Sequence, residues 1–266
     1  MIVDAHHHLL ADSSGRDYAD GLVDKMDTSQ VQVTVISGLG LRSHNWVGDL
    51  TPNNEDVAHA VRRHPGRLLG IGAIRLGDST PDEVARLHDR GFVGLKTTRP
   101  RYAYDDHRFD EVYATAVERQ LPILFHTGFI VGVEADRSDD VSSERCRPAH
   151  LDRVARTFPE LTIIMAHLGM PWHEEAAQMC RFHPRVYTDL SGSLGGWRSR
   201  KPPEFFRDLF YWDGAWDKVL YGSDVHYQDM AAALADYRRL LAGAPLQVVD
   251  SVLGGTAAHI FGLTER

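Results

Sequence analysis

The stretch Ile2-Val3-Asp4-Ala5-His6-His7-His8 decides between the two common α/β architectures. Its apolar, β-branched start is typical of a strand that is buried on both faces of a parallel sheet. In a doubly wound open sheet, the first strand usually runs into a glycine-rich turn. Here the strand ends in three histidines, so the sequence favours a closed barrel over an open sheet.

Further apolar runs, each bounded by turn residues, predict strands along the rest of the chain. Together with the first, the predicted strands are Ile2–His7, Val31–Ser37, Leu68–Leu76, Phe92–Thr97, Pro122–Thr127, Leu161–His167, Val186–Leu190 and Lys218–Gly222. Their starts recur at intervals of roughly 24 to 39 residues, close to the length of one βα unit. Eight such units in roughly 250 residues predict a (β/α)8 TIM barrel.

Amphipathic stretches with helix-capping residues lie between these strands. The clearest begins at Thr80-Pro81-Asp82-Glu83, which offers an N-cap, a proline in the first turn and a glutamate three residues after the cap. Gly91 stands where that helix should end. Further helices are expected over 105–120, 149–160, 172–182, 203–212 and 229–242. We expect a single domain over residues 1–266, with a terminal helix after Leu246 that packs outside the barrel.

Composition excludes several functional classes. The 266 residues are 43% apolar, and 29 basic against 37 acidic side chains give a net charge of −8, which is unlike a general nucleic-acid binder. No apolar run approaches the roughly 18 residues that a membrane span needs, and the N-terminus does not read as a signal peptide. The two cysteines, Cys146 and Cys180, form no disulfide framework. We therefore expect a cytoplasmic protein that binds neither nucleic acid nor a membrane.

Histidines and one aspartate stand at the carboxyl ends of four predicted strands, which is where a TIM barrel builds its active site. Because side chains alternate along a strand, His6 and His8 should point to one side and His7 to the other. The ends of the later strands contribute His126, His167 and Asp224. Imidazoles with one carboxylate suit Zn²⁺, or another first-row divalent ion such as Mn²⁺.

Each of these residues alone also has an ordinary structural explanation. A single histidine at a strand end is more often a hydrogen-bonded core residue, and Asp224 could simply cap the helix that follows it. Five candidates at four strand ends of one barrel nevertheless favour a metal site. We expect one divalent metal ion, with Zn²⁺ as the first choice and Mn²⁺ as the second.

These motifs resemble the amidohydrolase superfamily, and more narrowly its amidohydrolase-related branch, which includes the aminocarboxymuconate-semialdehyde decarboxylase group. The resemblance spans essentially the whole chain and rests on Asp4–His8, His126, Ala166–Gly169 and Gly222–Asp224, supported by Gly94–Lys96, Tyr187–Gly192 and Ala257–Leu263. It implies a metal-dependent barrel enzyme. The implied metal ligands are His6, His8, His126 and Asp224. Asp224 would also accept or relay a proton, and His167 would act as an acid or base.

The resemblance raises a question about Lys96, since a carboxylated lysine at the end of the fourth strand bridges two metals in binuclear members of the superfamily. Lys96 lies near that place, but in the branch that this chain resembles the equivalent lysine is usually not a ligand. We therefore expect one metal rather than two. Relatives also commonly have an aromatic residue and a proline after Gly-Ser-Asp, whereas here Val225 and His226 follow, which makes His226 a candidate for substrate contact.

Other candidate substrate contacts border the predicted barrel mouth. Arg99 could pair with a carboxylate, although a solvated surface arginine is an equal alternative. Trp172 and Trp197 offer aromatic surface, and the loop Ser43-His44-Asn45-Trp46 lies at the same end. The segment 129–148 is longer than an ordinary loop and predicts a lid or an interface element.

The leading functional hypothesis is a hydrolase of a small amide, lactone or similar carbonyl compound that uses metal-activated water. The alternative is a non-oxidative decarboxylase or related carbon–carbon lyase acting on a small unsaturated or aromatic acid. A positively charged pocket containing Arg99 would favour that acid substrate. A minor alternative is a non-catalytic metal-binding barrel. The expected partner is a small, anionic or neutral substrate, and a homodimer is allowed for.

Overall fold

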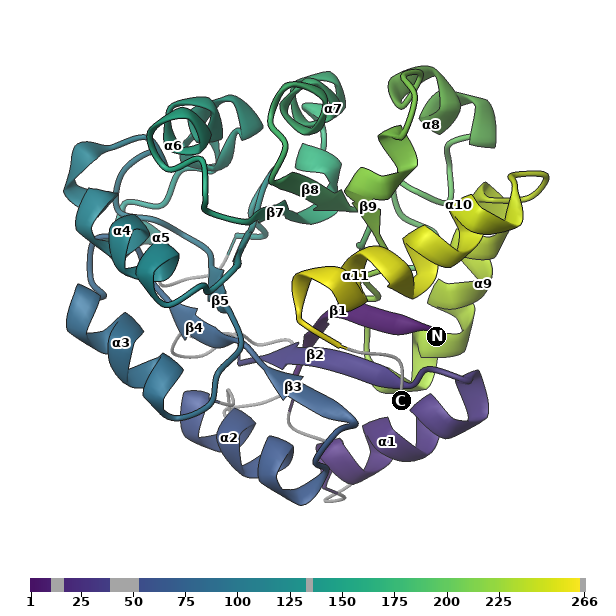
Figure 1. The fold of residues 1–266 in the computed structure, drawn as a ribbon, viewed down its shortest axis with the longest axis horizontal. Coiled ribbons are helices and arrows are strands. Elements are labelled where there is room, and N and C mark those ends of the chain that lie inside the picture. Colours follow the sequence, from purple (N-terminus) through teal and green to yellow (C-terminus); the bar gives the residue numbers. More distant parts are fainter. Residues whose placement is uncertain (11–16, 39–52, 133–135, 264–266) are drawn as a thin grey trace.

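Parallel strands lie at the centre of a ring of helices (Figure 1). The computed structural model describes residues 1–10, 17–38, 53–132 and 136–263. Its strands are β1 (Val3–His8), β2 (Val33–Ser37), β3 (Leu68–Gly70), β4 (Gly72–Ile74), β5 (Leu95–Thr97), β6 (Ile123–Phe125), β7 (Ile163–Met165), β8 (Val186–Asp189) and β9 (Val219–Leu220). All eight predicted strands are confirmed, with β3 and β4 as two halves of the third.

Backbone hydrogen bonds join the strands into a TIM barrel. Strands β1 to β3 pair in one parallel group and β4 to β9 in another. The groups meet at Ile71, whose N–H donates to Ile36 O at 2.9 Å, while the N–H of the next residue donates to Gly94 O. At the other seam, Ala5 N–H donates to Tyr221 O, and Asp224 N–H donates to the carbonyl of His6, both at 2.9 Å. The predicted (β/α)8 architecture is therefore confirmed.

One extra residue in β1 sets the direction of its histidines. Four residues of β1 pair with β2, and the register shifts by one residue between Asp4 and His7, as in a β-bulge. Ala5 belongs to the apolar cluster inside the barrel, yet the adjacent His6 also reaches inward, to Asp189 of β8. Simple alternation from Ala5 would have turned His7 inward. The bulge instead directs His7 outward, where it contacts Tyr18 of α1 (Tyr18–Ser29).

The helices lie where capping residues predict them. Thr80 Oγ1 accepts a hydrogen bond from Glu83 N at 3.3 Å, and Gly91 has φ +88° beyond the helix end. The predicted helices are α3 (Pro81–Asp89), α4 (Asp110–Glu118), α6 (Leu151–Thr157), α7 (His173–Phe182), α8 (Pro203–Leu209) and α9 (Met230–Leu240). The chain adds α1, α2 (Asn54–Arg63) and the short α5 (Asp136–Asp139). Within the described ranges, no helix combines the length and apolarity that crossing a membrane requires.

The terminal helix covers one end of the barrel. It consists of α10 (Leu246–Asp250), a π-helical turn at Ser251–Gly255 and α11 (Thr256–Ile260). Ala257 joins the inner apolar cluster, whose other members are Val3, Ala5, Val33, Val35, Ile71, Leu124, Ile164, Ala166 and Leu220. The expected terminal helix after Leu246 is confirmed, and it lies over the open end of the barrel, where an apolar interior needs a cover.

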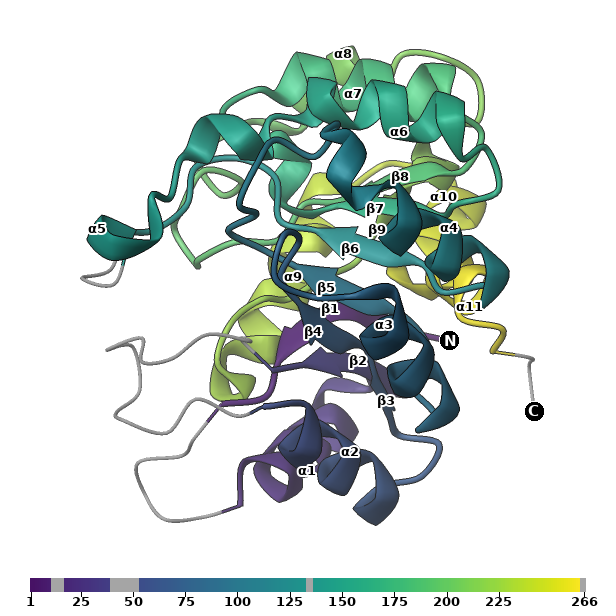
Figure 2. The same cartoon turned by 90° about the vertical axis from the view of Figure 1, so that its left-hand side faces the viewer.

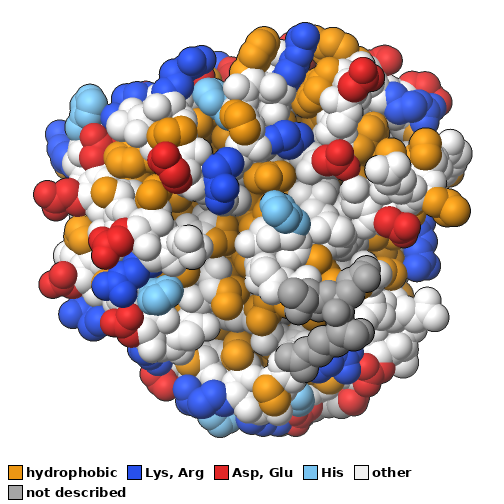
Figure 3. Space-filling view, viewed as in Figure 1, with side chains coloured by type: hydrophobic (Ala, Val, Ile, Leu, Met, Phe, Trp, Pro, Cys, Tyr) orange, Lys and Arg blue, Asp and Glu red, His pale blue; other side chains and the backbone are white. Residues whose placement is uncertain are grey.

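Two views place this cover at the end of the barrel opposite the candidate site. Figure 2 shows α11 on the same side of the barrel as the N-terminus, while α5 projects from the other side. The covered face, seen in Figure 3, carries acidic and basic side chains interspersed around its rim. Since parallel strands start at the end that holds the N-terminus, the carboxyl ends of the strands face the side of α5.

The contact of the terminal helix with β1 leaves no room for a side chain at Gly254. A Cβ at this position would lie 2.1 Å from Met1 O, whereas a Cβ on Gly255 would meet its nearest atom at 3.3 Å. We predict that Gly254→Ala costs about 1–3 kcal/mol of unfolding free energy by overpacking. Thermal unfolding should show a Tm lowered by several degrees. Gly255→Ala is the matched control; an equal loss in both variants would contradict this packing.

Candidate metal centre

Two histidines of β1 and one aspartate beyond β9 bring their ligand atoms together. His8 Nε2 lies 3.5 Å from Asp224 Oδ1, and His6 Nε2 lies 4.0 Å from the same oxygen. Ligand atoms of the three residues all lie within 4.8 Å of one another. Three of the four predicted metal ligands therefore form one cluster at the carboxyl ends of their strands.

The opposite ring nitrogens of both histidines have hydrogen-bond partners. His6 Nδ1 lies 2.8 Å from Asp189 Oδ2, and His8 Nδ1 lies 3.0 Å from Ser37 Oγ. Partners on Nδ1 leave the Nε2 atoms directed toward Asp224, as is usual for metal-binding histidines. Burial lowers the pKa of His8 to about 3, so its ring is neutral at physiological pH, the form that binds metal. This donor set fits a divalent ion.

Asp224 is held in place through its backbone. Its φ is +46°, a left-handed conformation that is uncommon for an aspartate. Its N–H donates to the carbonyl of His6 at 2.9 Å, which fixes the carboxylate beside the β1 histidines. Burial raises the pKa of the Asp224 carboxyl, but its electrostatic interactions with the neighbouring histidines and with Lys96 outweigh this effect and bring the pKa below its usual value. The carboxylate is therefore ionised at neutral pH.

His167 approaches the same carboxylate from the end of β7. Its Nδ1 lies 3.8 Å from Asp224 Oδ2 and 2.8 Å from Ser191 Oγ. His167 and Leu168 have φ angles of +61° and +46°, conformations that cost on the order of 1–3 kcal/mol each for residues other than glycine. Burial lowers the pKa of His167, which keeps its ring neutral near pH 7.

His126, the fourth predicted ligand, lies beside this cluster. Its ring centroid is 5.0 Å from that of His167, and its Nε2 is 3.4 Å from Phe129 O. Burial and the nearby His167 lower its pKa well below the usual value. Neither of the two close groups of potential ligand atoms among the described residues includes His126, so ligation by His126 stays a prediction.

Lys96 of β5 reaches the cluster from inside the barrel. Its Nζ lies 3.1 Å from His6 Nε2, and only 3% of the residue is exposed. Burial lowers the pKa of Lys96 to about 8. Its position agrees with that of the strand-four lysine, while its role as a carboxylated bridging ligand stays a prediction.

Asp189 and Ser191 are site residues to which the sequence reasoning gave no role. They lie in Tyr187–Gly192, a stretch recognised only as a family motif, although Asp189 stands at the carboxyl end of a predicted strand. The strand-end rule that found the histidines could have found it. Asp189 also shares a set of potential ligand atoms with His6 and His167. Its oxygen is 2.8 Å from His6 Nδ1, so the pair is hydrogen-bonded.

Arg99 follows β5 and is engaged by the long segment that comes after β6. Its Nε donates to Asp136 Oδ1 at 2.9 Å and its Nη2 donates to Val131 O at 2.6 Å. Arg75 binds the same segment, at Asp139 Oδ2, at 2.8 Å. The described part of the segment predicted to be a lid or an interface element is thus attached to the barrel by ion pairs. Substrate binding by Arg99 stays a prediction.

The predicted aromatic contacts flank the site and support its loops. Trp197 Nε1 donates to Ser191 O at 3.1 Å, and Trp172 stacks on Phe129 with ring centroids 5.4 Å apart. His226 Nδ1 accepts a hydrogen bond from Gln228 N at 3.3 Å and so caps the turn that follows. The predicted loop Ser43–Trp46 lies outside the described residues.

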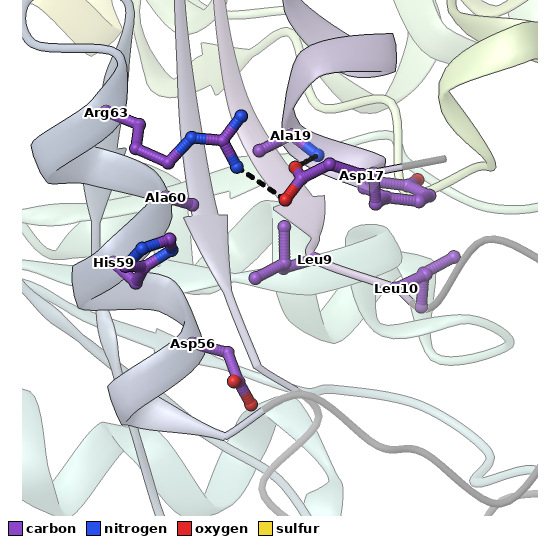
Figure 4. Close-up of a pocket in the computed structure, with 9 residues that line it drawn as sticks. Leu9, Leu10, Asp17, Ala19, Asp56, His59, Ala60 and Arg63 are labelled. Carbon is purple, nitrogen blue, oxygen red and sulfur yellow. Dashed lines mark hydrogen bonds and ion pairs between the residues drawn. The ribbon is translucent and has the colours of Figure 1, made fainter. Parts of the chain in front are cut away.

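A separate pocket of about 180 Å³ lies between α1 and α2 (Figure 4). Arg63 reaches across it to Asp17, as the dashed line in the figure marks. Its described lining consists of Leu9, Leu10, Asp17, Tyr18, Ala19, Asp56, His59, Ala60 and Arg63. These residues are distinct from the clustered ligands, so the pocket does not alter the assignment of the site.

Comparisons with known proteins agree with this architecture. The family model described as amidohydrolase matches residues 3–263. An uncharacterized TIM-barrel protein from Bordetella bronchiseptica has a TM-score of 0.72 at 18% identity, with 98% of each chain covered. A probable 2-pyrone-4,6-dicarboxylic acid hydrolase from Acinetobacter baumannii has a TM-score of 0.66 at 15% identity, covering 98% of this chain and 99% of that chain.

A decarboxylase has the same fold. The dihydroxybenzoic acid decarboxylase from Polaromonas with bound manganese has a TM-score of 0.70 at 15% identity, with 100% of this chain and 98% of that chain covered. Among curated proteins, protein fluG of Emericella nidulans is 27% identical over 77 residues, which cover 29% of this chain and only 8% of that relative. At these identities, the structural likenesses establish the fold.

The cluster predicts the metal content of the protein. After reconstitution with Zn²⁺, wild type should hold about one metal per chain, because the two sets of potential ligands among the described residues share His6 and so cannot both be filled through the same imidazole nitrogen. Asp224→Ala should lose most of it in elemental analysis, while the exposed His59→Ala should retain it. Unchanged content in Asp224→Ala would contradict the assignment. Content near two that falls by one in Lys96→Ala would contradict the single-metal prediction.

Proposed function

The chain belongs to the amidohydrolase family, and from that membership we propose that it is a metal-dependent hydrolase of a small amide, lactone or similar carbonyl compound. The observation that carries the proposal is the position of the Asp224 carboxylate. It faces ring nitrogens from two strand ends, with His8 Nε2 at 3.5 Å and His167 Nδ1 at 3.8 Å. Asp224, a proposed metal ligand that can also act as a base, thus lies next to His167, a second group that can carry a proton.

The donor set supports a resident divalent ion. His6, His8 and Asp224 would hold it, with His126 as the further ligand that the family resemblance implies. Nitrogen and carboxylate ligands suit Zn²⁺, and Mn²⁺ is the second choice. When bound, such an ion supplies Lewis acidity that polarises a carbonyl group and lowers the pKa of water toward 7.

The protein's own groups would move the protons. The ionised Asp224 carboxylate accepts a proton from the attacking water as the new carbon–oxygen bond forms. Asp224 then delivers that proton to the departing nitrogen or oxygen, and the neutral ring of His167, through its Nε2, is the second group at the site that can accept and return a proton. One water is consumed, and the carbon–nitrogen or carbon–oxygen bond breaks to give an acid and an amine or alcohol.

The position of Arg99 favours hydrolysis over decarboxylation. An open, positively charged pocket containing Arg99 would have supported an acid that loses carbon dioxide. The guanidinium instead binds the Asp136 carboxylate and the Val131 carbonyl. Because a hydrolase and a decarboxylase share this fold, the reaction has to be identified from its products.

A product screen tests the proposal. We expect the Zn²⁺-reconstituted protein to convert at least one member of a panel of small lactones, amides and acids, with a mass gain of one water. Asp224→Asn should lower kcat at least about 100-fold because the base is lost. His59→Ala should match wild type.

The alternative outcomes are distinct. Loss of carbon dioxide from an acid would replace the hydrolase proposal with decarboxylation. Retained metal with no turnover, and with wild type and Asp224→Asn indistinguishable across the panel, would indicate a non-catalytic metal-binding barrel.

A further inference from the structure

We propose that Asp189 is a positioning residue whose two carboxylate oxygens serve two different tasks. Oδ2 orients His6 for metal binding, and Oδ1, through the Ser191 hydroxyl, orients His167 for proton transfer. The second task rests on the proposed function, whereas the first concerns metal binding alone. Asp189 and Ser191 are both fully buried, so water does not compete for these bonds.

The first task follows from the geometry at His6. Asp189 Oδ2 lies 2.8 Å from His6 Nδ1, and both side chains are 1% exposed. A carboxylate can only accept hydrogen bonds, so Nδ1 must carry the ring hydrogen. His6 Nε2 therefore presents its lone pair, which agrees with the Lys96 Nζ donor 3.1 Å away. This is the tautomer that a metal ligand needs.

The second task follows from the other oxygen. Asp189 Oδ1 accepts hydrogen bonds from Ser191 N at 2.8 Å, from His167 N at 2.9 Å and from Ser191 Oγ at 2.5 Å. The Ser191 hydroxyl has then used its only hydrogen. It can only accept from His167 Nδ1, 2.8 Å away, so this ring too is protonated at Nδ1. His167 Nε2 is left free to take a proton.

Asparagine at position 189 would break this arrangement in a predictable direction. Its NH₂ group cannot replace Oδ1, because two fixed backbone N–H groups already point there. The NH₂ group must therefore face His6, where it can be accommodated only if His6 moves its hydrogen from Nδ1 to Nε2. That tautomer has no Nε2 lone pair. Asp189→Asn should thus impair metal binding while the isosteric side chain preserves packing.

Two variants separate the two tasks. Asp189→Asn should weaken Zn²⁺ affinity about 10- to 100-fold in a chelator competition, the range for groups that orient metal ligands. Ser191→Ala removes a hydroxyl that lies 3.2 Å from His6 Nδ1 but leaves the shorter 2.8 Å Asp189–His6 bond intact, so Zn²⁺ affinity should stay within about threefold of wild type. Its kcat should fall about tenfold or more at unchanged KM, because His167 loses its acceptor.

Thr188→Val is the matched control. Thr188 is buried on the same strand, and its hydroxyl donates to two backbone carbonyls, Met165 O at 2.8 Å and Asp189 O at 3.1 Å, and to neither the Asp189 carboxylate nor the Ser191 hydroxyl. It should lower Tm without changing Zn²⁺ affinity or kcat. Nitrogen-15 NMR of the histidine rings in the full-length, metal-free chain gives a readout that loss of stability alone does not move. His6 should be protonated at Nδ1 in wild type and at Nε2 in Asp189→Asn.

The outcomes distinguish a positioning role of Asp189 from a purely structural one. An unchanged His6 tautomer in Asp189→Asn, or affinity losses that merely follow Tm in all three variants, would overturn the proposal. If Asp189→Asn does not fold, the ring of His167 in Ser191→Ala decides, since it should lose its fixed Nδ1 hydrogen bond. If Zn²⁺ affinity and tautomers behave as expected but wild type turns over nothing, the proposed hydrolase function fails and the first task of Asp189 stands.

Discussion

The β-bulge in β1 is the constraint on which the site depends. Without the extra residue, every second side chain of β1 would point into the barrel, so that His7 would point inward after Ala5. The bulge allows Ala5 to complete the apolar core while His6, the very next residue, enters the polar end. Its disturbed backbone lies at the seam of the barrel. There the His6 carbonyl accepts a hydrogen bond from Asp224 N, so one local irregularity places both His6 and Asp224 of the candidate metal centre.

Two buried aspartates secure this region from opposite sides. Asp4 accepts hydrogen bonds from the backbone of His6 and Ser223, at 3.2 and 2.9 Å, and so supplies partners that the bulge removes from the regular ladder. Asp189 binds the imidazole of His6 from within the barrel. Buried carboxylates are costly unless they are fully hydrogen-bonded, and both of these are. The site is therefore built into the barrel wall and does not depend on a surface loop.

The sequence was sufficient for the strands and for the residues at their ends, because strand periodicity and strand-end chemistry are local properties. It could not predict the bulge, since a register shift exists only relative to β2. Arg99 shows a second limit: its partner Asp136 is 37 residues away, in a segment without periodicity. Asp189 was within reach of the strand-end rule, but its partner could not be predicted, because its hydrogen bond to the His6 ring exists only in the folded barrel. The terminal helix was predicted, but its place over the barrel end was not.

The central claim is that His6, His8 and Asp224 hold a single divalent ion. Anomalous diffraction at the zinc edge, from crystals of the Zn²⁺-loaded protein, tests it most directly. The account predicts one strong peak about 2.0–2.2 Å from His6 Nε2, His8 Nε2 and a carboxylate oxygen of Asp224. A peak between His6 Nδ1 and Asp189, or one confined to surface histidines, would contradict it.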